Sequence, residues 1–360
     1  MSQQPPSEIE KIPTRNPNES LDKAPTLAPP STVAAQQKIN TPEAIAADQL
    51  YGTAPPSNEL WQETAGGQLE GTSLWRDAWR RLKKNKFAML GLIVTGIIIV
   101  ASLLGPTLLR IATKGTHTYD FIPQQGELVR AMPPSLNHPM GTDPQGRDML
   151  ARVLYGGQIS LMVGLVSTFV SLLIGVAYGA TAGYLGGRVD NLMMRIVDVL
   201  FAIPYMMLVI VLLALFEKSL VLLFAALGAI SWLTMARIVR GQVLSLKNQE
   251  FVEAARSIGV PTWKIILRHL VPNTLGPVIV YATLTVPSVM LQEAFLSYLG
   301  LGVQAPRSSW GTLAAEGAQN IAIFPWLIIF PGIVMALTLF SLNFVGDGLR
   351  DALDPQMRKV

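Results

Sequence analysis

Long apolar runs separated by shorter polar segments dominate the pattern of this chain from residue 87 onward. About 20 mainly apolar residues in a helix are enough to cross the hydrocarbon core of a bilayer. Six runs come close to this length, and each predicts one membrane-spanning helix. They lie at 87–110, 158–184, 197–216, 219–236, 272–295 and 321–344. The pattern therefore predicts an all-α, polytopic membrane protein with six transmembrane helices.

The chain before the first apolar run has a different pattern. Residues 1–72 are rich in Pro, Gln, Ser and Thr and poor in aromatic residues. Such a segment cannot bury enough apolar surface to offset the entropy of folding, so we expect a disordered tail. From residue 73 apolar side chains recur three and four residues apart with Lys and Arg between them. Residues 73–110 therefore predict an interfacial helix followed by the first span.

Basic residues gather beside two of the polar segments, and this asymmetry predicts the topology. They are Arg76, Arg80, Arg81, Lys83, Lys84 and Lys86 before the first span, and Arg237, Arg240, Lys247, Arg256, Lys264 and Arg268 between the fourth and fifth. Lys and Arg mark cytoplasmic flanks. The loop 111–157 is nearly balanced in charge, and we expect it to be extracytoplasmic. An even number of spans then places the tail 1–72, the C-terminal tail 346–360 and both termini in the cytoplasm, with the core at 158–345.

Small residues and prolines interrupt the apolar pattern inside the spans. Gly175, Gly179, Gly183 and Gly187 recur every four residues in the second span. Such a stripe predicts close helix packing, either within this chain or against a second subunit. Prolines inside spans bend or break helices, because proline lacks an N–H and clashes with the preceding turn. The prolines expected to do so are Pro204, Pro287, Pro325 and Pro331.

Composition excludes several other functions. The chain is 50% hydrophobic and 14% charged, and it has no cysteine and three histidines that are far apart in the sequence. No metal site is therefore predicted by local spacing. The modest basic excess fits membrane topology better than nucleic-acid binding. No Gly-Lys pair, His-Glu-x-x-His or Gly-x-Ser-x-Gly pattern occurs, so we predict neither a catalytic residue nor a cofactor bound by this chain itself.

Charged residues inside predicted spans are functional candidates, because charge in hydrocarbon is costly. Arg195, Asp198 and Glu293 are in this position. Arg195 and Asp198 are three residues apart, which favours a mutual ion pair over a contact with substrate. Glu293 has no obvious cation on its own helix. It is either a pathway or gating residue or a hydrogen-bonded structural residue, and the sequence leaves both open.

The polar segment between the fourth and fifth spans contains a recognisable pattern. It reads Glu253-Ala254-Ala255, three further residues, Gly259, and a helix-like run that ends at Pro272. Glu250–Ser257 can form a short helix, and Gly259 can supply the left-handed residue that ends it. Pro261 suits the first turn of a second helix. We therefore predict a compact docking knob near 245–270.

This pattern resembles the docking loop, or coupling helix, of the membrane permease subunits of ATP-driven (ABC-type) importers. Three other segments are similar to the dipeptide/oligopeptide/nickel group of these importers. They are Gly141-Thr142-Asp143-Pro144-Gln145-Gly146-Arg147-Asp148, the segment 295–304, and the ending 346–355. The resemblance covers residues 73–360, and it is to the second permease of the pair, the "C" component.

The resemblance implies a bacterial inner-membrane permease that pairs with a homologous second permease and receives substrate from an extracytoplasmic binding protein. One or two cytoplasmic ATPase subunits would bind ATP and Mg and dock on this chain. The docking residues implied are Glu253, Ala254, Ala255, Gly259 and Pro272. The expected cargo is a di- or oligopeptide, with nickel or another small solute as the alternative. A secondary transporter is disfavoured, because neither a buried charge relay nor inverted repeats are evident.

Overall fold

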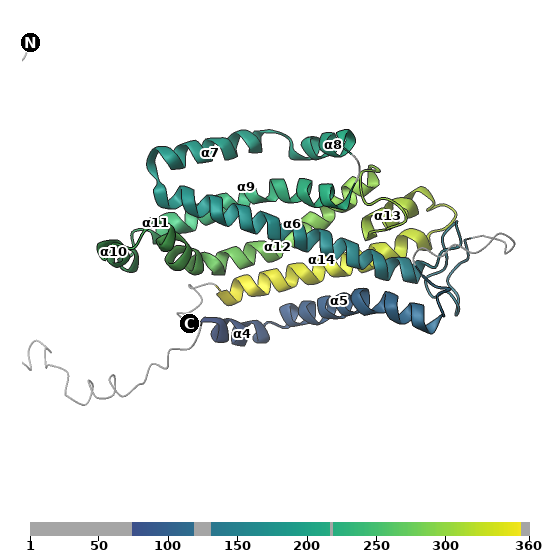
Figure 1. Cartoon of the computed structure of the whole chain (residues 1–360). Helices are drawn as coiled ribbons and strands as arrows, with labels where there is room; N and C mark the ends of the chain where they lie inside the picture. Colours follow the sequence, from purple (N-terminus) through teal and green to yellow (C-terminus); the bar gives the residue numbers. More distant parts are fainter. Residues whose placement is uncertain (1–73, 119–130, 217–218, 354–360) are drawn as a thin grey trace, which may run out of the picture. The chain divides into compact units, whose positions relative to one another are not determined.

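Helices joined by turns and short loops make up the described part of the chain (Figure 1). This computed structural model describes residues 74–118, 131–216 and 219–353, and the predicted tail 1–72 lies outside them. No strand forms within these ranges, where one isolated bridge joins Thr142 and Asp148. The predicted all-α class is confirmed.

The long helices correspond one to one with the predicted spans. They are α5 (Lys86–Ala112), α6 (Met149–Leu185), α7 (Gly187–Ala202) with α8 (Tyr205–Leu215), α9 (Leu220–Leu246), α12 (Val271–Tyr298) and α14 (Trp326–Leu353). Among the described residues, five helices are long and apolar enough to cross a membrane, or six if the bent pair α7–α8 is one span. The prediction of a polytopic membrane protein is confirmed.

Two helix ends differ from the predicted ones. α6 begins at Met149 rather than near 158, since the Asp148 carboxylate accepts a hydrogen bond from the Ala151 amide and caps the helix. The last part of the predicted loop 111–157 is therefore helical. α14 likewise continues to Leu353, through the start of the predicted tail 346–360. A hydropathy pattern detects the apolar middle of a helix and misses its polar ends.

The third span is broken near its middle. α7 and α8 meet at Ile203 and Pro204 with a bend of 75°. Ile203 has extended dihedral angles, φ −75° and ψ 128°, as expected for a residue that precedes proline. The prediction for Pro204 is therefore confirmed. Pro287 and Pro331, in contrast, lie inside continuous helices.

The glycine stripe of α6 packs against α9 of the same chain. A Cβ atom at Gly175 would lie 2.6 Å from the Met235 Cβ, and one at Gly183 would lie 3.0 Å from the Arg240 carbonyl oxygen. A Cβ at Gly179 would meet the carbonyl group of Ala236. The absent side chains let the two backbones approach closely. The alternative that the sequence left open is thereby settled in favour of internal packing for these three glycines.

Shorter helices lie at both ends of the long ones. α4 (Leu74–Lys84) buries Ala78 and Leu82 against Ala88 and Ala352 and leaves Trp79 47% exposed, as an amphipathic helix does. α13 (Trp310–Gln319) begins with a capping box in which Ser309 and Thr312 bond reciprocally. α10 (Glu250–Ser257), α11 (Thr262–Lys264) and the π-helix η1 (Ile265–Leu270) connect α9 to α12. Figure 1 shows α10 and α13 at opposite ends of the long helices.

Candidate functional site

The polar segment between α9 and α12 forms a compact knob, defined here as residues 250–270. Its first helix, α10, spans Glu250–Ser257, as the sequence predicts. Gly259 has φ +79°, its N–H donates to the Arg256 carbonyl at 2.9 Å, and the Val260 N–H donates to the Ala255 carbonyl at 3.1 Å. These two bonds are the Schellman arrangement that ends a helix at a left-handed residue. The predicted role of Gly259 as the helix stop is confirmed.

The inner face of the knob packs into the helices behind it. Val252 and Ala255 are buried with Ile265 and Leu270 of η1 in one hydrophobic cluster. The cluster also contains Ala180 of α6, Met235, Val239 and Val243 of α9, and Val278 of α12. Burying one Val or Leu side chain contributes about 1.5–3 kcal/mol. The knob is therefore part of the same packed body as three of the long helices.

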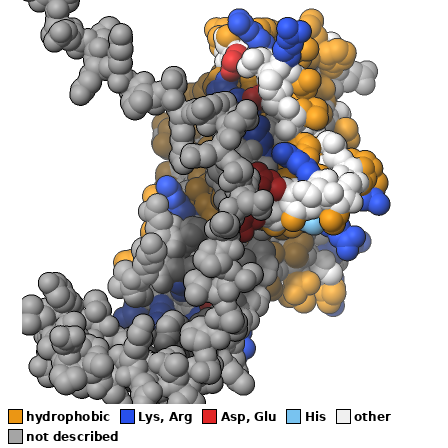
Figure 2. Space-filling view, turned by 90° about the vertical axis from the view of Figure 1, so that its left-hand side faces the viewer, with side chains coloured by type: hydrophobic (Ala, Val, Ile, Leu, Met, Phe, Trp, Pro, Cys, Tyr) orange, Lys and Arg blue, Asp and Glu red, His pale blue; other side chains and the backbone are white. Residues whose placement is uncertain are grey.

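The outer face of the knob carries exposed apolar side chains. Ile258 is 80% exposed and Trp263 is 60% exposed, while Glu253 and Ala254 are also exposed. Figure 2 views the molecule from the side on which α10 lies in Figure 1 and shows Lys and Arg side chains among hydrophobic ones.

Two other predicted docking residues lie apart from this outer face. Ala255 is only 4% exposed, because it faces the cluster behind the knob. Of the predicted docking residues, Ala255 therefore packs against the body of the chain. Pro272 is exposed, but it lies in the first turn of α12, beyond the knob.

The last turn of the knob, which runs into α12, is wider than an α-helix. η1 spans Ile265–Leu270, and the Val271 N–H after it donates to the Ile266 carbonyl, five residues back. It follows α11 directly and runs into α12 without a break. Wide turns of this kind are rare and occur frequently at functional sites. No pattern in the sequence predicted it.

A cavity of about 300 Å³ lies between the bend of α7–α8, α9 and α12. Leu200, Phe201, Ile203 and Tyr205 line it from the bent span, and Ser231 and Thr234 from α9. The α12 wall combines the apolar Leu284 and Val289 with four polar residues, which are Tyr281, Thr285, Ser288 and Gln292. Steps of four, three and four residues place these side chains on one helix face. The sequence analysis missed this stripe, although the same spacing could have revealed it.

The two charged residues predicted to pair within α7 do not do so. The Asp198 carboxylate binds Arg237 of α9 at 2.7 Å, and Arg195 is exposed, with no ion pair in the described part of the chain. A second link joins the same helices, because the Arg240 guanidinium donates twice to Asp190, at 2.5 and 2.7 Å. Spacing within one helix cannot show that a neighbouring helix offers a closer partner. α7 is therefore held to α9 by two ion pairs.

Glu293 lies beside the cavity-lining Gln292 in sequence but faces another way. It is 1% exposed, and its carboxyl group accepts hydrogen bonds from the Ser297 and Ser309 hydroxyl groups, both at 2.6 Å. Ser309 belongs to the loop before α13, so the three side chains tie that loop to α12. Of the two roles that the sequence left open, the structure matches the hydrogen-bonded structural one.

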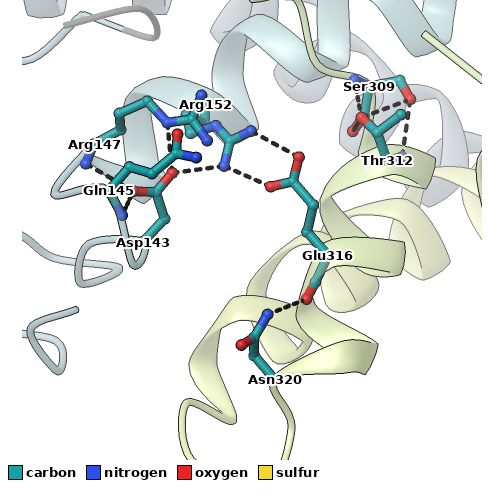
Figure 3. Close-up of polar contacts among 8 residues, drawn as sticks. All are labelled: Asp143, Gln145, Arg147, Arg152, Ser309, Thr312, Glu316 and Asn320. Carbon is teal, nitrogen blue, oxygen red and sulfur yellow. Dashed lines mark hydrogen bonds and ion pairs between the residues drawn. The ribbon is translucent and has the colours of Figure 1, made fainter. Parts of the chain in front are cut away.

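A charged network joins the segment before α6 to α13 (Figure 3). The Asp143 carboxylate accepts bonds from the Gln145 and Arg147 amides at 2.9 Å, from Arg147 Nε at 2.6 Å and from Arg152 Nη1 at 2.8 Å. Arg152 also donates to both oxygens of Glu316, at 2.8 and 3.2 Å. Asp143 and Arg152 are buried, whereas the Glu316 side chain is 51% exposed. This network explains the charged pattern of the 141–152 segment.

Two histidines that are 21 residues apart in the sequence come together beside α6. His117 and His138 both lie within 3.3 Å of the Asp148 carboxylate. Local spacing in the sequence could not predict this cluster, because its three residues come from segments that are apart in the sequence. The third, His269, lies in η1.

These features define a class of protein. Residues 153–359 match the family model described as "Binding-protein-dependent transport system inner membrane component", and residues 73–134 match "N-terminal TM domain of oligopeptide transport permease C". The first match alone spans more than half of the chain. The chain belongs to this family of multi-pass inner-membrane permease subunits.

Individual relatives narrow the resemblance further. The chain is 50% identical over 292 residues to the "Oligopeptide transport system permease protein OppC" of Haemophilus influenzae, covering 81% of this chain and 91% of the relative. It is 46% identical over 288 residues to the "Dipeptide transport system permease protein DppC" of Bacillus subtilis, covering 80% and 87%. A solved chain of the MetNI methionine ABC transporter is 18% identical, with a TM-score of 0.46, and the match covers 57% of this chain and 98% of that chain.

Proposed function

We propose that this chain is a permease subunit of an ATP-driven importer that carries di- or oligopeptides across the cytoplasmic membrane. The observation that carries the proposal is its identity of 46–50% with oligopeptide and dipeptide permeases over about four-fifths of its length. The chemistry of the cavity supports the same cargo. Its polar lining consists of hydroxyl, phenol and amide groups, which can bond to peptide groups, whereas a nickel path would favour imidazole ligands.

The partner proteins are inferred from the cavity, from the exposed outer face of the knob and from the opposite end of the long helices. A homologous second permease would close the cavity from the other side. The outer face of the knob, with Ile258 and Trp263, would enter a groove of a cytoplasmic ATPase subunit, and ATP and Mg would be bound there rather than by this chain. A binding protein would deliver the peptide on the opposite side of the membrane. The arrangement of α10 and α13 at opposite ends of the long helices supports this division (Figure 1).

Peptide uptake tests the cargo. In cells that lack this permease, uptake of a labelled tripeptide should fall to background while nickel uptake stays unchanged, and the native chain should restore it. Ser288→Trp should restore less, because the indole ring fills the cavity between α12 and the bent span. Ile333→Trp on α14, where the native side chain is already 52% exposed, is the matched control. Loss of nickel uptake with normal peptide uptake would reverse the cargo assignment.

Thiol labelling tests the orientation, since the native chain supplies no cysteine background. Leu136 is fully exposed in the segment before α6, and Ile258 is 80% exposed on the knob. We expect a membrane-impermeant reagent to label Leu136→Cys in intact cells, and to label Ile258→Cys only after lysis. The motivation is the basic flank around the knob. The opposite labelling order would overturn the topology.

A further inference from the structure

A cluster of three potential ligands joins the end of one span to the start of the next. His117 follows α5, His138 lies in the segment before α6, and Asp148 caps α6. His138 Nδ1 lies 2.7 Å from Asp148 Oδ2, and His117 Nδ1 lies 3.3 Å from the same oxygen. The two imidazole rings are stacked, with centroids 4.7 Å apart and planes 11° from parallel. Both rings therefore present the same nitrogen to one carboxylate oxygen.

The separations suit a small metal ion. The three ligand atoms lie within 4.8 Å of one another. In a tetrahedral zinc site with bonds of about 2.0–2.2 Å, neighbouring ligand atoms lie about 3.3 Å apart. The distance from His117 Nδ1 to Asp148 Oδ2 already has this value. For both Nδ1 lone pairs to point at one ion, the two stacked rings would have to turn about their side-chain bonds and His138 would have to move outward by about half an ångström, and both side chains are 21% exposed.

The charge of the cluster points to a cation. The Asp148 side chain is 2% exposed, and within the described ranges only the two histidines lie at ion-pair distance from it. The nearby arginines Arg147 and Arg152 are bound to Asp143 instead. A buried carboxylate without a permanent positive partner is costly. A divalent ion between two imidazoles and this carboxylate would remove that cost.

The ligands are held in place by the backbone around them. Asp148 Oδ1 accepts the Ala151 amide at 2.9 Å, which fixes the carboxylate and leaves Oδ2 facing the histidines. The His138 amide donates to the Ser135 hydroxyl at 3.2 Å, and the His117 amide donates to the Thr113 hydroxyl at 3.2 Å. These bonds fix the carboxylate of Asp148 and the backbone at the two histidines.

We propose that His117, His138 and Asp148 form a binding site for a divalent transition-metal ion of the zinc class. Three protein ligands leave a fourth position for water. The site shares no residue with the cavity between α7–α8, α9 and α12, so it is a structural clip rather than part of the cargo path. The bound ion would fasten the segment after α5 to the start of α6.

Zinc titration of the purified, assembled transporter tests the proposal. Wild type should bind one more equivalent of Zn²⁺ than His117→Ala or His138→Ala at a metal-buffered free concentration. Affinity should fall about 100-fold or more in either variant, because even loss of an outer partner of a ligand costs 10–100-fold. His269→Gln, which removes the histidine in η1, is the matched control and should keep the wild-type stoichiometry.

A second measurement covers variants that assemble poorly. His117→Cys should keep the site with a thiolate ligand, and Co²⁺ should then give a sulfur-to-cobalt absorption band that the wild-type complex lacks. The native chain has no cysteine, and partner contributions cancel in the difference spectrum. Equal Zn²⁺ stoichiometry in wild type and both alanine variants, including none in any of them, would overturn the proposal. So would a Co²⁺ spectrum of the cysteine variant identical to that of wild type.

Discussion

Replacing Arg152 with Met should destabilise the permease by about 3–5 kcal/mol, the usual cost of removing one partner of a buried ion pair. The Arg152 side chain is 3% exposed and contacts Asp143, whose side chain is 2% exposed. Methionine fills much of the same volume but leaves the Asp143 carboxylate with less compensation for its buried charge. The loss of stability is measured by heating the detergent-solubilised complex and monitoring the intact fraction by size-exclusion chromatography.

The two acidic partners of Arg152, Asp143 and Glu316, should contribute differently to the stability of the fold. Glu316 is 51% exposed, and ion pairs with exposed groups contribute about 0–1 kcal/mol, so Glu316→Gln should have a small effect. Arg147→Met is the matched control, because Arg147 is more exposed than Arg152 and its loss leaves Asp143 bound to Arg152. Unfolding temperatures of Arg152→Met and Arg147→Met that agree within error would show that the network does not hold α13 to α6.

Replacing Gly259 with Val should leave the complex assembled but reduce peptide uptake about tenfold. The φ of +79° is unfavourable for a residue with a Cβ by about 1–2 kcal/mol, and most so for a β-branched one. A cost of that size lowers the ratio of correctly folded to misfolded knob about 5–30-fold. Among the described residues, no atom beyond Gly259 and its two chain neighbours lies within 4 Å of a Cβ built there, so the effect is one of backbone conformation and not of a clash.

Gly259→Asn separates conformation from side-chain size. Asparagine adopts positive φ more readily than other residues with a Cβ, so this variant should retain most of the uptake. Uptake and peptide-stimulated ATP hydrolysis are measured in reconstituted vesicles with equal amounts of assembled complex. If the valine variant matched wild type in both assays, the left-handed turn would have no role in docking.

The sequence predicted those features that depend on local spacing. Apolar runs located the long helices, and the position of Gly259 after Glu250–Ser257 located the end of α10, because helix caps follow local rules. Features made by contacts between distant segments were missed. Asp198 binds Arg237 rather than Arg195, and His117 meets His138 and Asp148. Such contacts depend on how helices pack, and spacing along one helix does not report it.

The cavity was only partly predictable from the sequence. The polar stripe on α12 at Tyr281, Thr285, Ser288 and Gln292 was present in the sequence as a helical spacing. The sequence did not show which neighbouring helices this polar face meets, because any face of a span can be turned toward a neighbour. The bend at Pro204 was predicted, but the structure was needed to show that the bent span and the stripe enclose one space.

The wide turn η1 sets the direction in which the knob points. Each residue of an α-helix advances the chain by about 100° around its axis. A π turn contains about one residue more than an α turn. The part of the knob before Ile265 is therefore rotated by about 100° relative to α12. With ordinary α-helical bonds over the same residues, Ile258 and Trp263 would face a different quarter of the surroundings. The six residues of η1 therefore set the direction in which the knob faces, and two of them, Ile265 and Leu270, also belong to the buried cluster behind it.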